Sequence, residues 1–180
     1  MPTILTHAIV PLAAGIAGGQ RRLPPRLVVA GMIASMLPDA DVFAFALGIP
    51  YADAFGHRGA SHSLLFAAVV ASLGTPLHRR LHAGAWRAWL WLFACAASHP
   101  LLDAFTNGGL GVALYWPWSD VRLFAPWRPI EVSPIGAGFF GRRGLDVLLS
   151  ELRWLWLPMT ALAALGYSVR RAAAALSSQR

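Results

Sequence analysis

Five apolar segments constrain this chain most, because each is long enough, or nearly so, to cross a hydrocarbon core that takes about 20 helical residues. They cover residues 4–19, 27–48, 61–77, 86–106 and 152–169. Hydrophobic residues make up 57% of the 180 residues and charged residues 13%, whereas soluble domains have roughly 45–50% and about 25%. The sequence therefore predicts an all-α fold, a polytopic helical membrane bundle of about four or five transmembrane segments, in a single domain over residues 1–180.

Prolines are expected to shape these helices, because proline removes an amide donor and clashes with the preceding turn. They stand at Pro38, Pro76, Pro100 and Pro158. Each is expected to kink or end its helix, so we expect broken helices. Residues 107–151 are rich in Trp, Pro and Gly and predict one long structured loop with tryptophans at the membrane interface. Glu131 in this loop is expected to reach back over the other polar motifs, and residues 170–180 form a basic tail.

All of the positive charge comes from arginine, since the fifteen basic residues include no lysine. The arginines stand mostly in pairs at the ends of apolar segments, as in short loops of membrane proteins, and not along one helix face as in a nucleic-acid site. We therefore expect no nucleic-acid partner. An outward N-terminus puts nine arginines inside and six outside. The inner group is Arg21, Arg22, Arg26, Arg79, Arg80, Arg87, Arg170, Arg171 and Arg180; the outer group is Arg58, Arg122, Arg128, Arg142, Arg143 and Arg153.

Ionisable side chains inside apolar segments cost several kcal/mol unless they are paired or bind a metal, so each is a candidate functional group. With an outward N-terminus, seven of them meet in the outer half of the bundle: His7, Asp39, Asp41, His57, His62, His99 and Asp103. His99 and Asp103 stand at i and i+4, on one helix face. Imidazole nitrogens and carboxylate oxygens are ordinary ligands of zinc or manganese. The pattern favours a metal site.

Simpler explanations remain open for these motifs. His99 and Asp103 can form a hydrogen-bonded couple without a metal. Asp39 or Asp41 can cap a helix after Pro38, although two carboxylates so close together would repel each other in a low dielectric.

The stretch from His57 to Ser63 has alternatives of its own. Ser61 or Ser63 can cap the following helix, and His57 can be an exposed loop residue. Arg58 offers a planar fork for phosphate, or it can form a salt bridge with Asp53.

The expected ligands suffice for one or two divalent ions, zinc first and manganese or magnesium next. The first ligands are expected to be Asp39, His62, His99 and Asp103. His7, Asp41 and His57 complete the set, with Asp41, His57 and Arg58 as catalytic residues. Cys95 is the single cysteine and lies in an apolar run, so a thiolate site is excluded. Because a metal lowers the pKa of bound water toward about 7, hydrolysis is the natural chemistry.

These motifs resemble the YdjM-like membrane-bound metal-dependent hydrolases of bacteria and archaea. The resemblance rests on Thr6-His7, on Pro38 to Asp41, on His57 to Ser63, on His99 to Asp103 and on Trp116 to Ser119. It implies a helical integral protein of the plasma (inner) membrane, assigned as a hydrolase. The order of His and Asp is also remotely similar to the zinc-dependent phospholipase C and P1 nuclease pattern, but no counterpart of that pattern's final His-x-x-x-Glu follows Asp103.

The expected function is hydrolysis of phosphoesters of lipid or lipid-linked substrates at the outer face, with membrane lipids as partners. The alternative is a metal-binding or ion- or proton-transport protein, since intramembrane Asp and His also line such pathways. A third possibility is a structural protein in which the metal only holds short helices together. The inner halves of the segments are nearly free of polar residues, which favours an enzyme.

Overall fold

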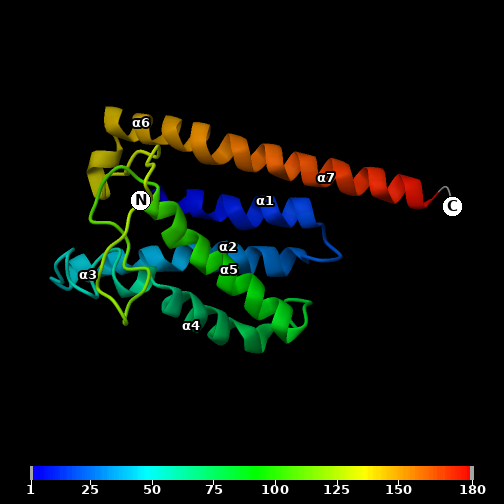
Figure 1. The fold of residues 1–180 in the computed structure, drawn as a ribbon, viewed down its shortest axis with the longest axis horizontal. Coiled ribbons are helices and arrows are strands. Elements are labelled where there is room, and N and C mark those ends of the chain that lie inside the picture. Colours follow the sequence, from blue (N-terminus) through cyan, green and yellow to red (C-terminus); the bar gives the residue numbers. More distant parts are fainter. Residues whose placement is uncertain (1, 179–180) are drawn as a thin grey trace.

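The computed structural model describes residues 2–178, and over these residues the protein is helical, without β-strands (Figure 1). The first half contains η1 (Ile4–Ala8), α1 (Ile9–Gly18), α2 (Pro25–Met36), η2 (Leu37–Val42), α3 (Phe43–Ala46), η3 (Ala60–His62), α4 (Leu64–Gly74) and η4 (Thr75–Leu77). The second half contains α5 (Ala85–Ala104), η5 (Gly136–Phe139), α6 (Arg142–Glu151), the π-helical turn η6 (Leu152–Trp156) and α7 (Leu157–Ser177). Each of the predicted apolar segments is helical, so the all-α prediction is confirmed.

Two of the four prolines, Pro38 and Pro76, mark the end of an α-helix as predicted. Pro38 lies where α2 gives way to the tighter turns of η2, and Pro76 lies in η4 at the end of α4, whereas Pro158 is the second residue of α7, which continues from η6. Pro100 does not end its helix, because α5 continues to Ala104. The helix α5 packs against α2 and α4, and neighbouring helices commonly stabilise a proline within a membrane helix.

The helices α1, α2, α5 and α4 lie side by side, and α7 packs along α1 (Figure 1). Their contacts are made mainly by small residues. The buried cluster between α2, α4 and α5 consists of Ala34, Ala67, Ala71, Leu92, Cys95, Ala96 and Ala97. Small residues let helix backbones approach closely, which is how helices associate in a membrane. Gly31 illustrates this, since a Cβ there would lie 2.3 Å from Trp91 Nε1.

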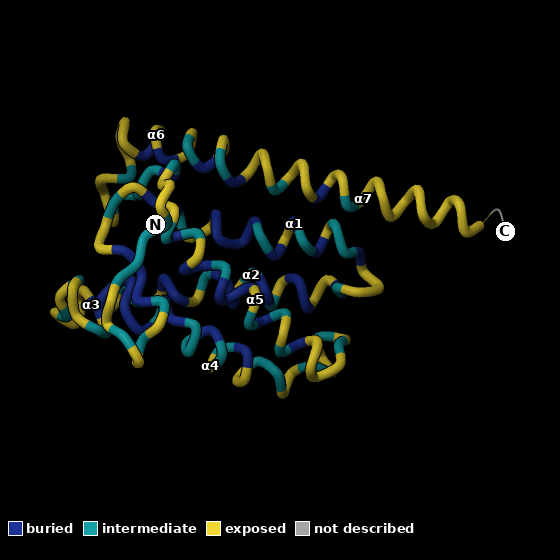
Figure 2. Tube along the Cα trace, in the orientation of Figure 1, coloured by how far each residue is buried: buried dark blue, intermediate teal, exposed yellow. Residues whose placement is uncertain are grey.

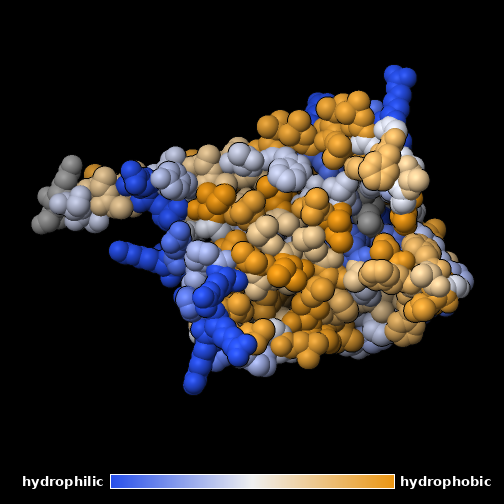
Figure 3. Space-filling model, turned by 180° about the vertical axis from the view of Figure 1, so that it is seen from behind, coloured by the Kyte–Doolittle hydropathy of each residue, from blue (hydrophilic) through white to orange (hydrophobic). Residues whose placement is uncertain are grey.

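Among residues 2–178, one continuous helix, Pro25–Ala46, is both long and apolar enough to cross a membrane. Ile4–Gly18 and Leu64–Leu77 are apolar but shorter, so the further predicted spans stay predictions. Figure 3 shows an apolar surface over the middle of the molecule, with most of the visible hydrophilic side chains at one end and fewer at the other. Figure 2 shows that α7 is exposed over most of its second half, where it extends beyond the other helices.

The predicted loop over residues 107–151 is too long, because residues 142–151 form the helix α6. Its buried residues Gly144, Val147 and Glu151 are spaced three and four apart on one face, which is the pattern of a helix packed on one side. The remaining loop, residues 105–141, is held by isolated bridges between Thr106 and Ile130 and between Val112 and Leu123.

Candidate metal centre

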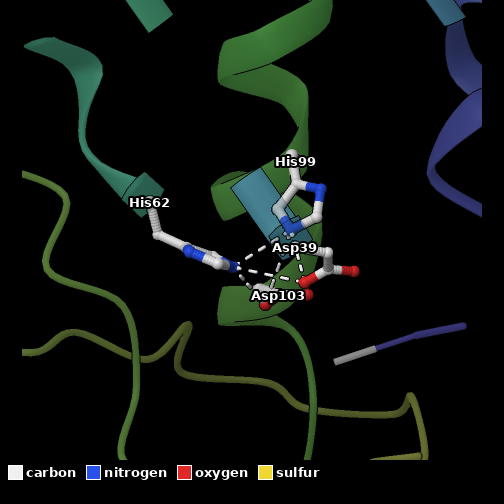
Figure 4. A group of neighbouring side chains, drawn as sticks. All are labelled: Asp39, His62, His99 and Asp103. Carbon is white, nitrogen blue, oxygen red and sulfur yellow. Dashed lines mark hydrogen bonds and ion pairs between the residues drawn. The ribbon is translucent and has the colours of Figure 1, made fainter. Parts of the chain in front are cut away.

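Four side chains converge at the end of the bundle that carries the N-terminus: Asp39 from η2, His62 from η3, and His99 and Asp103 from α5 (Figure 4). Each offers one ligand atom, and these atoms all lie within 4.8 Å of one another. His62 Nε2 lies 3.3 Å from Asp103 Oδ2, and His99 Nε2 lies 3.3 Å from Asp39 Oδ1. None of the four side chains is more than 1% exposed. The structure therefore gathers the residues expected as first ligands into one buried cluster.

Local structure explains why these side chains meet. The change from α-helix to the 3-10 turns of η2 at Pro38 leaves Asp39 buried at the end of α2. Ser63 caps α4 by accepting a hydrogen bond from the amide of Phe66 at 3.0 Å, which fixes the start of that helix directly after His62. His99 and Asp103 share one face of α5, as their spacing predicts. Ser63, rather than Ser61, is therefore the cap.

The carboxylates of Asp39 and Asp103 are the strongest indication of a cation. All four of their oxygens are buried and none accepts a hydrogen bond, although Asp103 Oδ2 forms an ion pair with Arg58 Nε at 3.1 Å. Buried anionic oxygens without donors are costly, because burial removes the water that would solvate them. A divalent ion between the two carboxylates and the two imidazoles would satisfy these oxygens. The donor set of nitrogen and oxygen atoms also suits such an ion, so the residues present fit a metal.

Both histidines of the cluster are oriented for metal binding. His99 Nδ1 lies 2.7 Å from the backbone carbonyl oxygen of Ser35, which only accepts, so Nδ1 carries the proton. His62 Nδ1 lies 3.1 Å from Asp41 Oδ2. Metal-binding histidines usually donate their second ring N–H to a carbonyl or a carboxylate in this way. In both residues Nε2 is then the nitrogen that faces the two carboxylates.

Asp41 lies beside the cluster, and its carboxylate is surrounded by hydrogen-bond donors. Its carboxylate accepts hydrogen bonds from the ring of His57 at 2.5 Å, the amide of Arg58 at 3.1 Å and the hydroxyl of Ser61 at 2.5 Å. Asp41, His57 and His62 form a second group that could hold a metal ion. A metal there would have to displace these hydrogen bonds. Neither Asp39 nor Asp41 makes the side-chain helix cap considered from the sequence.

His7 and Tyr51 flank the cluster. The His7 ring is fully buried, stacks on the ring of His99 with 3.6 Å between centroids, and places Nε2 3.5 Å from Asp103 Oδ1. Neither of its nitrogens has a hydrogen-bond partner. In the loop after α3, the Tyr51 ring meets His57 edge-on at 5.3 Å, and burial raises the pKa of this phenol. His7 is thus a neighbour of the four central side chains through Asp103.

Arg58 is buried and pairs with Asp103, so the predicted alternative of a salt bridge to Asp53 is wrong. Its Nε lies 3.1 Å from Asp103 Oδ2, and its two terminal nitrogens donate at 2.9 Å to the carbonyl of Gly108 and the hydroxyl of Thr106. The loop folds Arg58 inward with a φ of 64°, which is uncommon for a residue other than glycine. All three nitrogens of the guanidinium are therefore engaged within the protein.

Two glutamates of the predicted loop, Glu131 and Glu151, differ from expectation in their burial. Glu131 forms an exposed ion pair with Arg143 at 2.7 Å, so it turns outward instead of reaching over the site. Glu151, for which the sequence predicts no role, is 1% exposed and accepts hydrogen bonds from the hydroxyls of Thr3 and Thr6. It joins the start of η6 to the residue before His7. Its spacing from Val147 on one helix face was the only sequence signal for its burial.

The family described as YdjM inner membrane protein matches residues 1–175 of the chain. Inner membrane protein YbcI of Escherichia coli (strain K12) is 51% identical over 160 residues, which cover 88% of this chain and 92% of the relative. No solved structure is significantly similar. Both names agree with the predicted localisation, an integral protein of the plasma membrane.

Proposed function

We propose, for a chain that belongs to the YdjM inner membrane protein family, the function of a membrane-embedded, metal-dependent hydrolase of lipid or lipid-linked phosphoesters. The observation that carries the proposal is the set of four buried carboxylate oxygens that accept no hydrogen bond and face two oriented imidazoles, with a single arginine, Arg58, paired to one of them. Negatively charged oxygens and nitrogen lone pairs that face one another in a buried site of a membrane protein cost free energy unless a cation binds between them.

One divalent ion held by Asp39, His62, His99 and Asp103 is the simplest occupant. Zinc suits the nitrogen and oxygen donors and can expand to five ligands, while manganese or magnesium would leave two of six positions for water and substrate. When bound, such an ion supplies hydroxide at neutral pH by lowering the pKa of a bound water toward about 7. A phosphoester is the proposed substrate class because its leaving oxygen also benefits from a nearby cation.

The residues around the ion have separate proposed roles. Asp41 and His57, 2.5 Å apart, form a pair beside the ion that can accept a proton from water. Arg58 holds Asp103 in place and is not free to grip a phosphate, because its nitrogens are engaged. His7 packs against His99 and keeps water from that side of the cluster.

Transport of an ion or a proton is the competing function. A pathway needs polar groups along the whole bundle. The cluster lies at one end, however, and the core between α2, α4 and α5 consists of alanines, Leu92 and Cys95. This distribution favours an enzyme over a conduit. A purely structural metal would bind equally well in this cluster, and only turnover separates it from an enzyme.

The test is elemental analysis of detergent-purified protein, followed by a screen of phosphoesters including phospholipids. We expect stoichiometric divalent metal in the wild type and its loss in Asp39→Ala, His62→Ala, His99→Ala and Asp103→Ala, together with turnover. His78→Ala is the matched control, since His78 lies between α4 and α5, outside the cluster. A folded but metal-free wild type would overturn the proposal, and bound metal without turnover on any ester would favour the structural role.

A further inference from the structure

An apolar groove begins at the edge of the metal cluster. It has a volume of about 310 Å³ and is lined mainly by Phe55, Leu65, Phe66, Val69 and Trp116. Its polar lining consists of Asp41 and Ser61, which are hydrogen-bonded to each other, and Asp41 contacts His62 of the cluster. Its volume lies at the lower end of the range of roughly 300–1,000 Å³ that ligand sites occupy. A ligand in this groove would therefore have one end against the metal cluster.

The other end of the groove continues onto the outer surface of α4. Leu65 and Val69 line the groove, and Leu73 follows them at the same spacing of four, on the same helix face. Val69 is 45% exposed and Leu73 is 75% exposed. The helix α4 belongs to one of the predicted membrane segments, where exposed apolar side chains are expected to face hydrocarbon. The groove is thus continuous with a predicted lipid-facing surface.

We propose that this groove binds one acyl chain of a membrane phospholipid and places the phosphate-bearing headgroup beside the cluster of Asp39, His62, His99 and Asp103. The apolar aromatic lining fits a hydrocarbon chain, and the polar residues occur only at the end nearest the cluster. Hydrolysis of that lipid rests on the proposed function. Binding of the chain does not, so the two can fail separately.

A second apolar groove supplies a matched control. It is larger, about 480 Å³, and lies between the N-terminal residues and α6, with Ile4, Ile135, Phe139 and Phe140 in its lining. Its lining includes none of the four cluster residues. A substitution that fills this second groove shows whether added bulk at this end of the molecule, outside the first groove, also prevents an acyl chain from binding in the first groove.

The experiment reconstitutes the full chain in phosphatidylcholine vesicles that contain a phosphatidylcholine with a photoreactive diazirine near the end of one acyl chain. Mass spectrometry then locates the adducts. In the wild type we expect labelling at Phe55 and Trp116 above the labelling at Leu162, an exposed residue of α7 that serves as the lipid-facing reference. Leu65→Trp, and as a second blocking variant Val69→Trp, should abolish the excess at Phe55 and Trp116, whereas Ile135→Trp should leave it unchanged.

Labelling at Phe55 and Trp116 no higher than at Leu162, or an excess that survives both blocking variants, would overturn the proposal. Retained metal content shows that the blocking variants are folded. If the protein hydrolyses phosphoesters, Leu65→Trp should also raise KM for a long-chain substrate by a larger factor than KM for a short, soluble phosphate ester. Absence of all hydrolysis alongside groove labelling would refute the proposed function and leave the lipid site standing.

Discussion

His99 donates its Nδ1–H to the backbone carbonyl of Ser35 at 2.7 Å, across the contact between α5 and α2. This bond orients the Nε2 of His99 toward Asp39 without the help of another side chain. His62 receives the corresponding support from the carboxylate of Asp41. Of the two supports only the second can be removed by substitution, so Asp41 is the residue through which the orientation of the cluster can be tested.

We predict that Asp41→Asn weakens metal binding by about 10–100-fold while the stoichiometry stays at one ion, since loss of the carboxylate that orients a metal-binding histidine typically has this effect. Calorimetric titration of the metal-depleted protein measures both quantities. Asp120→Asn, in an exposed loop position, should leave them unchanged. A fall from two bound ions to one would instead make Asp41 a ligand in a second site with His57 and His62.

Gly59 is predicted to be indispensable for the loop that carries His57, Arg58 and His62. A Cβ at this position would lie 2.2 Å from the carbonyl oxygen of Ala54 and 2.9 Å from that of Gly56. Both are backbone atoms, so the loop itself would have to move. Gly59→Ala should therefore lower the metal content of the purified protein sharply, as measured by elemental analysis.

The control for this loop is Gly84→Ala. Gly84 precedes α5, and nothing lies within 4 Å of a Cβ built there. Its substitution should leave the metal content at the wild-type value. Full metal content in Gly59→Ala would mean that the loop tolerates a shift and does not fix the position of His62.

The sequence predicts the parts of this site that carry their own signal. Asp39 and Asp103 stand out because carboxylates are rare in apolar segments, and the helix break at Pro38 follows from the chemistry of proline. The support of His99 by Ser35 could not be predicted, because a backbone carbonyl has no signature in the sequence. The ion pair of Arg58 with Asp103 depends on an uncommon positive φ. No local pattern would indicate that backbone conformation.

Glu151 was missed for a different reason. Its hydrogen-bond partners Thr3 and Thr6 are separated from it by almost the whole chain, and a contact of that range leaves no periodic pattern. Glu131, which has two prolines nearby, looked more distinctive but forms only an exposed ion pair. A distinctive local sequence, such as prolines beside a glutamate, therefore does not predict which loop carboxylate is buried.

Glu151→Ala is predicted to lower the free energy of unfolding by about 1–3 kcal/mol, because the buried hydroxyl of Thr6 and the partly buried hydroxyl of Thr3 lose the carboxylate to which they donate. Glu131→Ala removes an exposed ion pair with Arg143 and should cost about 0–1 kcal/mol. Denaturant unfolding in detergent micelles compares the two variants. Equal stabilities would show that the bonds of Glu151 contribute no more than a surface pair.

The sidedness of the metal cluster is predicted from the arginines, because arginines in short loops favour the inner face of the membrane. Arg26 donates to the carbonyl of Arg80 at 3.4 Å, and Arg170 donates to the carbonyl of Ile16 at 2.7 Å. The described members of the predicted inner group therefore lie together at the end opposite the cluster, whereas Arg180 lies outside the described residues. Arg58 is counted with the outer group, but it is buried and paired with Asp103. It is therefore not a free loop charge, and the excess of inner over outer loop arginines becomes larger.

We predict that the cluster faces outward, and single cysteines test this in a Cys95→Ala background, since Cys95 is the only native cysteine. Asp120→Cys lies in the exposed loop near the cluster, and Ala85→Cys lies at the exposed start of α5 at the other end. A membrane-impermeant maleimide applied to intact cells should label the cysteine at position 120 and leave that at position 85 unlabelled until the cells are opened. The reverse pattern would place the cluster on the inner face, and its substrate would then have to come from the inner leaflet.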